Sequence, residues 1–166
     1  MIDIHSHLLP GIDDGSESLD VSLQMARDAV ADGVTHALMT PHHMNGRYVN
    51  HASDVIKLTA DFQTELNNAN IPLALFPSQE VRINGGLLSA LDDGDILTAD
   101  AQGTYILIEF PSDDVPAFTM DMLFQIQQRG LVPIIVHPER NTRLMKEPEL
   151  LYDMVSRGAY AQVTAS

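Results

Sequence analysis

The most constraining feature of this sequence is a repeated alternation of short apolar runs with longer amphipathic segments. Six runs have the apolar and β-branched composition that is typical of strands. They comprise residues 2–5, 34–40, 73–76, 105–110, 131–137 and 159–164. Strands that alternate with helices at a spacing of roughly 30 residues form right-handed βαβ units. The sequence therefore predicts an α/β fold with a parallel sheet, in one domain over residues 1–166.

Between the runs, apolar residues recur at intervals of three and four, as in an amphipathic helix. In the first segment Ser16 or Ser18 is available as a cap and Gly33 as the stop, and the second segment starts behind Ser53. The predicted helices are anchored by Leu19, Leu23, Ala26 and Val30; by Val55, Leu58, Phe62 and Leu66; by residues 86–91; by Phe118, Met122, Leu123 and Ile126; and by Leu150, Leu151, Met154 and Val155. The pattern alone does not separate an open sheet from a closed barrel, but no Gly-x-Gly-x-x-Gly follows the first strand to favour a dinucleotide fold.

Composition excludes several classes of function. Nine Lys and Arg against 23 Asp and Glu give a net charge of −14, which disfavours nucleic acid and anionic lipid as partners. The absence of cysteine excludes thiolate nucleophiles and thiolate metal sites. No basic leader precedes the first apolar run, and no apolar stretch has the length of a membrane span. We expect a cytoplasmic protein.

Metal-binding side chains follow or lie within five consecutive predicted strands. The carboxyl ends of parallel strands meet at one face of the fold, where active sites are built. His5 and His7 project from the same side of the first strand, a spacing that suits two imidazoles on one metal. The later strands deliver His42, Glu80, Glu109 and His137. The sequence therefore predicts that these groups converge.

Glu109 bears most on this prediction, because it lies inside the apolar run Tyr-Ile-Leu-Ile-Glu-Phe. A buried carboxylate needs a cation or hydrogen bonds to offset its desolvation. A metal is one such partner, and a structural ion pair with one of the few basic residues is the alternative. Asp13 or Asp14, in a Gly-Ile-Asp-Asp-Gly turn, adds one oxygen ligand.

Nitrogen and carboxylate ligands without sulfur suit Mn²⁺, Fe²⁺ or Zn²⁺. Ligands from this many strands exceed the need of one ion, so we expect two or three ions, a cluster suited to phosphoester hydrolysis. Arg140, in His-Pro-Glu-Arg, is the candidate phosphate-binding group, and a surface ion pair with Glu139 or Asp153 is its alternative.

Other polar residues receive weaker interpretations. Arg47 and Tyr48 lie in a long segment that could close over the site. We expect His36 to pack inside the fold, His43 to neighbour the true ligand and His51 to begin a helix.

Taken together, the motifs resemble those of one family. They are Met-Ile-Asp-Ile-His-Ser-His at 1–7, Asp-Asp-Gly at 13–15, Thr-Pro-His-His at 40–43, Gln-Glu-Val at 79–81, Leu-Ile-Glu-Phe at 107–110, His-Pro-Glu-Arg at 137–140 and Ala-Gln-Val-Thr-Ala-Ser at 161–166. In order and spacing this sequence resembles the bacterial metal-dependent protein-tyrosine phosphatases of the polymerase and histidinol phosphatase (PHP) superfamily, a group associated with capsule and exopolysaccharide production.

The resemblance implies a distorted (β/α)7 barrel with three ions, often Mn²⁺. By matching motif, His5, His7 and Glu80 would hold the first ion; Glu80, Glu109 and His137 the second; and Asp14 and His42 the third, with Arg140 on phosphate. Family members continue through a Ser-Asp-x-His segment that this chain lacks, so the resemblance implies a C-terminally incomplete barrel with about six strands.

The sequence thus leads to the hypothesis of a protein-tyrosine phosphatase that acts on a bacterial tyrosine kinase of capsule or exopolysaccharide synthesis. A hydroxide bridging the metal ions would attack phosphorus in line, without a phosphoenzyme. The alternatives are a small-molecule phosphatase of the histidinol-phosphate type and a non-catalytic metal-binding fragment that docks on a kinase or on further copies of itself.

Overall fold

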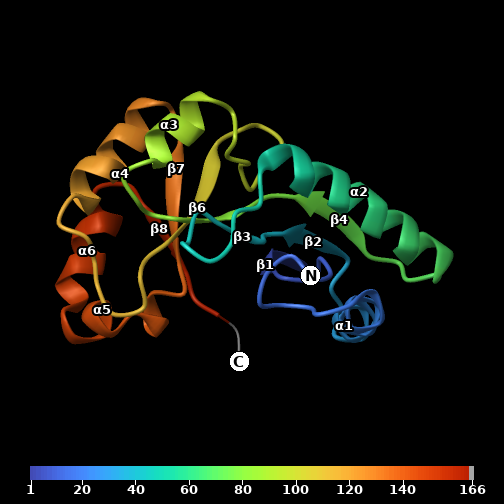
Figure 1. The fold of residues 1–166 in the computed structure, drawn as a ribbon. Helices are drawn as coiled ribbons and strands as arrows, with labels where there is room; N and C mark the ends of the chain where they lie inside the picture. Colours follow the sequence, from blue (N-terminus) through green and yellow to red (C-terminus); the bar gives the residue numbers. More distant parts are fainter. Residues whose placement is uncertain (165–166) are drawn as a thin grey trace.

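The computed structural model describes residues 1–164 and contains two parallel sheets flanked by helices (Figure 1). The three-stranded sheet has the order β1-β2-β4, with β1 at Ile2–Ser6, β2 at His36–Met39 and β4 at Ala74–Pro77. The five-stranded sheet has the order β3-β5-β6-β7-β8, with β3 at His42–His43, β5 at Glu80–Arg82, β6 at Tyr105–Glu109, β7 at Val132–Val136 and β8 at Tyr160–Gln162. Every paired strand runs parallel to its neighbour, which confirms the predicted α/β class with parallel strands, here divided between two sheets.

Each of the six predicted runs overlaps a strand, and residues 1–164 hold two further short strands that the sequence did not reveal. Strand β3 continues the course of β2 beyond Thr40-Pro41, and β5 continues that of β4 beyond Ser78-Gln79. Pro41 has no N–H to donate to a ladder, so the pairing breaks there. The chain leaves one sheet at these points and joins the other.

The helices are α1 (Leu19–Ala31), α2 (Ala52–Asn68), α3 (Leu87–Asp92), α4 (Thr119–Gln128), α5 (Thr142–Lys146) and α6 (Pro148–Ser156), with a short 3-10 helix, η1, at Pro138–Arg140. Helix α1 begins as predicted, because the Ser18 hydroxyl accepts the Val21 N–H at 3.3 Å. Helix α2 begins earlier than the Ser53 signal indicates. Its first N–H, on Ala52, donates to the distant Asp95 carboxylate at 2.9 Å, and His51 is the entry residue as expected.

Two hydrophobic clusters support the two sheets. Residues of β2 and β4 pack with α1 and α2, and residues of β5, β6 and β7 pack with α3, α4 and α6. In Figure 1 these two halves lie side by side, with β3 and β5 leading from one to the other. The expectation that His36 packs inside is wrong. Its side chain is exposed at the start of β2 and stacks on Phe76, with ring centroids 6.0 Å apart.

The carboxyl-terminal ends of β1, β6 and β7 meet at a common region with the first residues of β3 and β5, which directly follow the ends of β2 and β4. None of the helices that the structure describes is long and apolar enough to cross a membrane. The last two residues of the 161–166 motif, Ala165 and Ser166, lie outside the described residues.

Candidate metal centre

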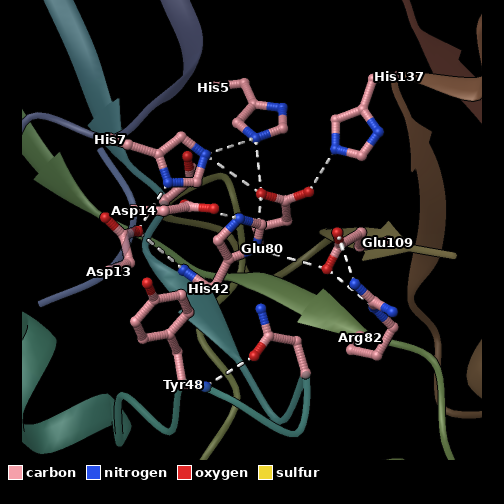
Figure 2. Close-up of polar contacts among 12 residues, drawn as sticks. His5, His7, Asp13, Asp14, His42, Tyr48, Glu80, Arg82, Glu109 and His137 are labelled. Atoms are coloured by element: carbon pink, nitrogen blue, oxygen red, sulfur yellow. Dashed lines mark hydrogen bonds and ion pairs between the residues drawn. The ribbon is translucent and has the colours of Figure 1, made fainter. Parts of the chain in front are cut away.

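Glu80 lies at the centre of a cluster of four histidines that lie on or directly after three strands, β1, β3 and β7 (Figure 2). Its carboxylate is fully buried, and its Oε2 atom lies 3.1 Å from Nε2 of His5, 3.2 Å from Nε2 of His7 and 3.2 Å from Nδ1 of His42. The other oxygen, Oε1, lies 2.5 Å from Nε2 of His137. His137 follows β7 in a left-handed conformation, with φ of 33°, which is uncommon for a residue other than glycine. One carboxylate therefore gathers four imidazoles.

The two aspartates of the Asp-Asp-Gly turn have different positions. Asp14 is largely exposed and places Oδ1 3.2 Å from Nε2 of His42, on the open side of the cluster. The Asp13 side chain is only 1% exposed; its Oδ2 lies 2.7 Å from Nδ1 of His7 and accepts the backbone N–H of His42 at 3.2 Å. Asp13 therefore helps to orient His7 and His42 from the buried side of the cluster. Asp14 faces the cluster's open side, where a ligand would enter.

Glu109 lies at the edge of the cluster with two different partners. Its Oε2 is 3.4 Å from Nδ1 of His42, and both of its oxygens accept hydrogen bonds from the Arg82 guanidinium, at 2.9 and 2.8 Å. The sequence posed a metal and a structural ion pair as alternatives for this carboxylate. The structure contains the ion pair and also directs the carboxylate toward His42.

Three groups of side chains each bring their ligand atoms within 4.8 Å of one another among the described residues. They are His5, His7 and Glu80; His7, Asp14 and His42; and His42, Glu80 and Glu109. Adjacent groups share His7, His42 or Glu80, which is the arrangement expected for several close ions. Nδ1 of His42 is buried and makes no well-directed hydrogen bond to any of residues 1–164. An unsatisfied buried nitrogen beside two carboxylates fits a divalent cation.

The electrostatics of the cluster favour cations at its centre. Burial alone would raise the pKa of Glu80, but hydrogen bonds from His137, His5 and His7 outweigh burial and hold that pKa far below its usual range. Burial would lower the pKa of His7, yet its hydrogen bonds to Asp13 and Glu80 raise it to about 10. Without metal, a proton on His7 thus offsets part of the negative charge of Asp13 and Glu80, and a bound cation would displace that proton.

A cavity of about 850 Å³ opens over the cluster. Its walls include His5, His7, Asp14, His42, Glu80, Glu109 and His137, and also Arg140 from η1. The structure thus brings together every side chain that the sequence singled out for metal or phosphate.

The Arg140 side chain is exposed, and its guanidinium makes no hydrogen bond or ion pair with the rest of the described chain. The surface pairs posed as its alternative are absent from residues 1–164, because Glu139 accepts the Thr164 N–H at 3.0 Å and Asp153 pairs with Arg157 at 3.1 Å. The guanidinium therefore projects from the cavity wall with its donors unused.

Arg47 and Tyr48 line no part of this cavity. The Tyr48 ring instead stacks on His42, with centroids 6.1 Å apart and planes 10° from parallel, and the Arg47 guanidinium lies 4.9 Å from the Tyr48 centroid. His43 is buried next to the cluster, as expected of a neighbour of the ligand.

Sequence reasoning missed two contributors and underrated a third. Arg82 gave no signal, because nothing in the sequence shows that it lies opposite Glu109 on the adjacent strand. Gln162, from β8, places Oε1 2.9 Å from Nδ1 of His5, across a separation of 157 residues. Asp13 was weighed only as an alternative ligand to Asp14, whereas its position supports His7.

Comparison with known proteins places the chain in a family. The family model described as capsular polysaccharide synthesis, CpsB/CapC, matches residues 1–166. The chain belongs to the CpsB/CapC family. Among the relatives of this CpsB/CapC chain, the tyrosine-protein phosphatase YwqE of Bacillus subtilis is 41% identical over 165 residues, and CapC of Staphylococcus aureus is 35% identical over 169 residues. These alignments cover 99% and 100% of the chain, and the chain spans 65% of the length of each relative.

The fold has a close counterpart among solved structures. It matches, with a TM-score of 0.92 and 41% identity, a chain from the crystal structures of YwqE from Bacillus subtilis and CpsB from Streptococcus pneumoniae, described as unique metal-dependent tyrosine phosphatases. The match covers 98% of this chain and 66% of the solved one. The α/β architecture with parallel sheets is therefore that of the family.

Proposed function

We propose that this CpsB/CapC-family chain is a metal-dependent phosphatase that hydrolyses phosphotyrosine in proteins. The observation that carries the proposal is the convergence of four histidines on the buried Glu80 beneath a cavity whose wall includes Arg140. The names of the relatives support the same activity, since YwqE and CpsB are described as metal-dependent tyrosine phosphatases.

The proposed ligands are those that the motifs single out. One ion would be held by His5, His7 and Glu80, a second by Glu80, Glu109 and His137, and a third by Asp14 and His42. The short distances from His42 to Glu80 and Glu109 make His42 available to the second ion as well. Bound divalent cations supply a water molecule acidic enough to react at neutral pH and neutralise charge on phosphate oxygens. We propose Mn²⁺, with Fe²⁺ and Zn²⁺ as alternatives, because the donors are nitrogen and oxygen only.

The role proposed for Arg140 is to bind phosphate. A guanidinium donates two parallel hydrogen bonds to phosphate oxygens, and this forked contact fixes the orientation of the phosphoryl group. Its charge matters in a chain with a net charge of −14, because the acidic surface repels a phosphorylated substrate at longer range. The leaving phenolate has a solution pKa of about 10, so it departs without a strong acid beside it.

The partner that we propose is the tyrosine kinase of a capsule or exopolysaccharide system. The family description, capsular polysaccharide synthesis, supports this choice. We propose a cytoplasmic location as well, since tyrosine kinases find their ATP there.

We further propose that the two sheets are arcs of one distorted barrel. The chain passes from the three-stranded sheet into the five-stranded sheet twice, between β2 and β3 and between β4 and β5, and returns once, between β3 and β4. On the other side, His5 at the edge strand β1 reaches Gln162 at the edge strand β8. The crossings on one side and the His5–Gln162 contact on the other would join the two sheets around one interior.

An assay with chelation tests the proposed activity. The chain is treated with excess chelator, and its hydrolysis of an aryl phosphate is measured before and after Mn²⁺ is restored. We expect the activity to disappear and return. Glu80→Gln should remain inactive with Mn²⁺, and the surface variant Glu149→Gln should behave as the unchanged chain.

Substrate comparison separates the alternatives. A phosphotyrosine peptide should be turned over faster than histidinol phosphate, and the reverse order would favour a small-molecule phosphatase. Activity that survives exhaustive chelation would refute the metal-dependent mechanism. Tightly bound metal without turnover of either substrate would favour a non-catalytic metal-binding role.

A further inference from the structure

The forked ion pair between Arg82 and Glu109 joins the candidate metal centre to a residue outside the ligand set. Nε of Arg82 donates to Oε2 of Glu109 at 2.9 Å, and an Nη2 hydrogen donates to Oε1 at 2.8 Å. The two residues lie opposite each other in the register of β5 and β6, so neighbouring strands fix their backbones. Figure 2 shows the guanidinium facing both carboxylate oxygens.

Arg82 and Glu80 lie two residues apart on the same short strand, and side chains two apart in a strand point to the same side. Strand β5 therefore places on one side both the Glu80 carboxylate, near the histidines, and the Arg82 guanidinium, which pairs with Glu109. The arrangement follows from the alternating direction of side chains along a strand.

Without Arg82, Glu109 would have little to hold its orientation. Its side chain is only 9% exposed, and its other close partner is Nδ1 of His42 at 3.4 Å. Glu80 lies 3.2 Å from the same nitrogen, so two acidic side chains compete for one imidazole and repel each other. A contact through both oxygens fixes the plane of the carboxylate, which a single contact cannot do.

The charge of Arg82 also differs in kind from that of the histidines. A histidine that binds a metal ion does so as the neutral imidazole, whereas a guanidinium stays charged at any physiological pH. Arg82 therefore offsets part of the negative charge of the cluster whether or not the histidines are protonated.

We propose that Arg82 is a positioning residue that holds Glu109 toward His42 and Glu80 for metal binding. This inference rests on the proposed metal-dependent function. Arg82 acts through Glu109 and touches neither metal nor substrate. Groups that orient metal ligands in this way commonly contribute 10–100-fold, as an order of magnitude, to metal affinity.

Metal affinity, measured by competition of the protein with a chelator for Mn²⁺, tests the proposal. Arg82→Gln should bind at least one ion roughly 10–100-fold more weakly than the unchanged chain. Arg82→Lys keeps the charge but loses the fork, so it should recover part of the affinity. The matched control is Arg129→Gln, which breaks a forked pair of the same kind with Asp92, at 2.8 and 2.8 Å, on the surface. That control should bind Mn²⁺ as the unchanged chain does.

A second comparison shows whether Arg82 acts through Glu109. In a Glu109→Gln background the carboxylate is gone, so Arg82→Gln should cause no further loss of Mn²⁺ affinity. Melting temperatures of the chelated variants report folding separately. If Arg82→Gln does not fold, Arg82→Lys serves as the test. We expect Arg82→Lys to weaken Mn²⁺ binding when residue 109 is glutamate. In the Glu109→Gln background, we expect Arg82→Lys to leave Mn²⁺ affinity unchanged.

The outcomes are distinct. Equal Mn²⁺ affinity of the folded Arg82 variants and the unchanged chain would overturn the role of Arg82 and leave the proposed function standing. An equal loss in the Glu109→Gln background would overturn it as well. An unchanged chain that binds no Mn²⁺ would remove the proposed function and this inference together.

Discussion

Gly15 offers a sharp test of the geometry, because it is not a metal ligand and yet limits how closely the Asp-Asp-Gly turn approaches His7. A Cβ atom at position 15 would lie 2.4 Å from both the Cβ and the carbonyl oxygen of His7. Ordinary contact begins at 3.4 Å, so Gly15→Ala requires a separation of about 1 Å between the turn and β1. His7 directly follows the paired strand β1, so its backbone atoms and Cβ cannot yield as the end of a flexible side chain does.

The displaced turn carries Asp13 and Asp14. We expect Gly15→Ala to lower the free energy of unfolding by about 1–3 kcal/mol, which is typical of overpacking. A displacement of about 1 Å in groups that orient a reaction costs on the order of 100-fold in rate, so aryl phosphate hydrolysis should fall by about that factor. Chemical denaturation of the chelated chain and a steady-state assay with Mn²⁺ measure the two effects.

The matched control is Gly85→Ala, at an exposed turn where an added Cβ meets nothing within 4 Å. It should change the free energy of unfolding by less than about 0.5 kcal/mol and leave the rate unchanged. If Gly15→Ala matched this control in both stability and rate, the close packing of the turn on His7 would contribute nothing to the site.

Three further predictions concern charge and metal. Mn²⁺ at about 100 times its dissociation constant should stabilise the chain by about 2.7 kcal/mol in thermal or chemical unfolding, and no change would contradict binding to the folded state. The pKa of His7 is raised from 6.5 to about 10 in the metal-free chain, so its contribution to stability is complete below about pH 6.5 and is lost as the pH rises toward 10. Melting of the chelated chain across that range should show this loss, and His7→Gln should flatten it. Arg140 is exposed and unpaired within residues 1–164, so Arg140→Ala should leave the melting temperature and Mn²⁺ affinity unchanged. It should weaken phosphate binding by roughly 10–100-fold, as expected for the loss of a charged hydrogen bond, and an unchanged KM would argue against a phosphate contact.

Much of the fold and of the candidate site was predictable from local patterns. The six strand runs and the five anchored helices follow from apolar periodicity, which reports which face of an element is buried. Convergence of His5, His7, His42, Glu80, Glu109 and His137 followed from one geometric rule, that parallel strands end at a common face. Short strands β3 and β5 escaped prediction because two or three residues carry too little periodicity to be recognised.

The mistakes have a common cause in contacts between distant segments. The start of α2 depends on the Asp95 carboxylate, which accepts the Ala52 N–H from 43 residues away. His36 has the flanking residues of an interior strand position, yet it lies at the open start of β2, where stacking on Phe76 covers it in part. Neither outcome is visible in the local sequence.

The sequence by itself determined the alternating elements, the acidic charge and the inventory of nitrogen and oxygen ligands without sulfur, because these depend on residue type and on spacing along one chain. Only the tertiary structure decided that Asp13 supports His7 while Asp14 faces the cavity, that Gln162 reaches His5, and that Arg82 grips Glu109. Those partners are set by strand register and by the crossing of the chain between two sheets. The directions of the side chains around Glu80 follow from that packing. The order of residues along the chain does not contain this information.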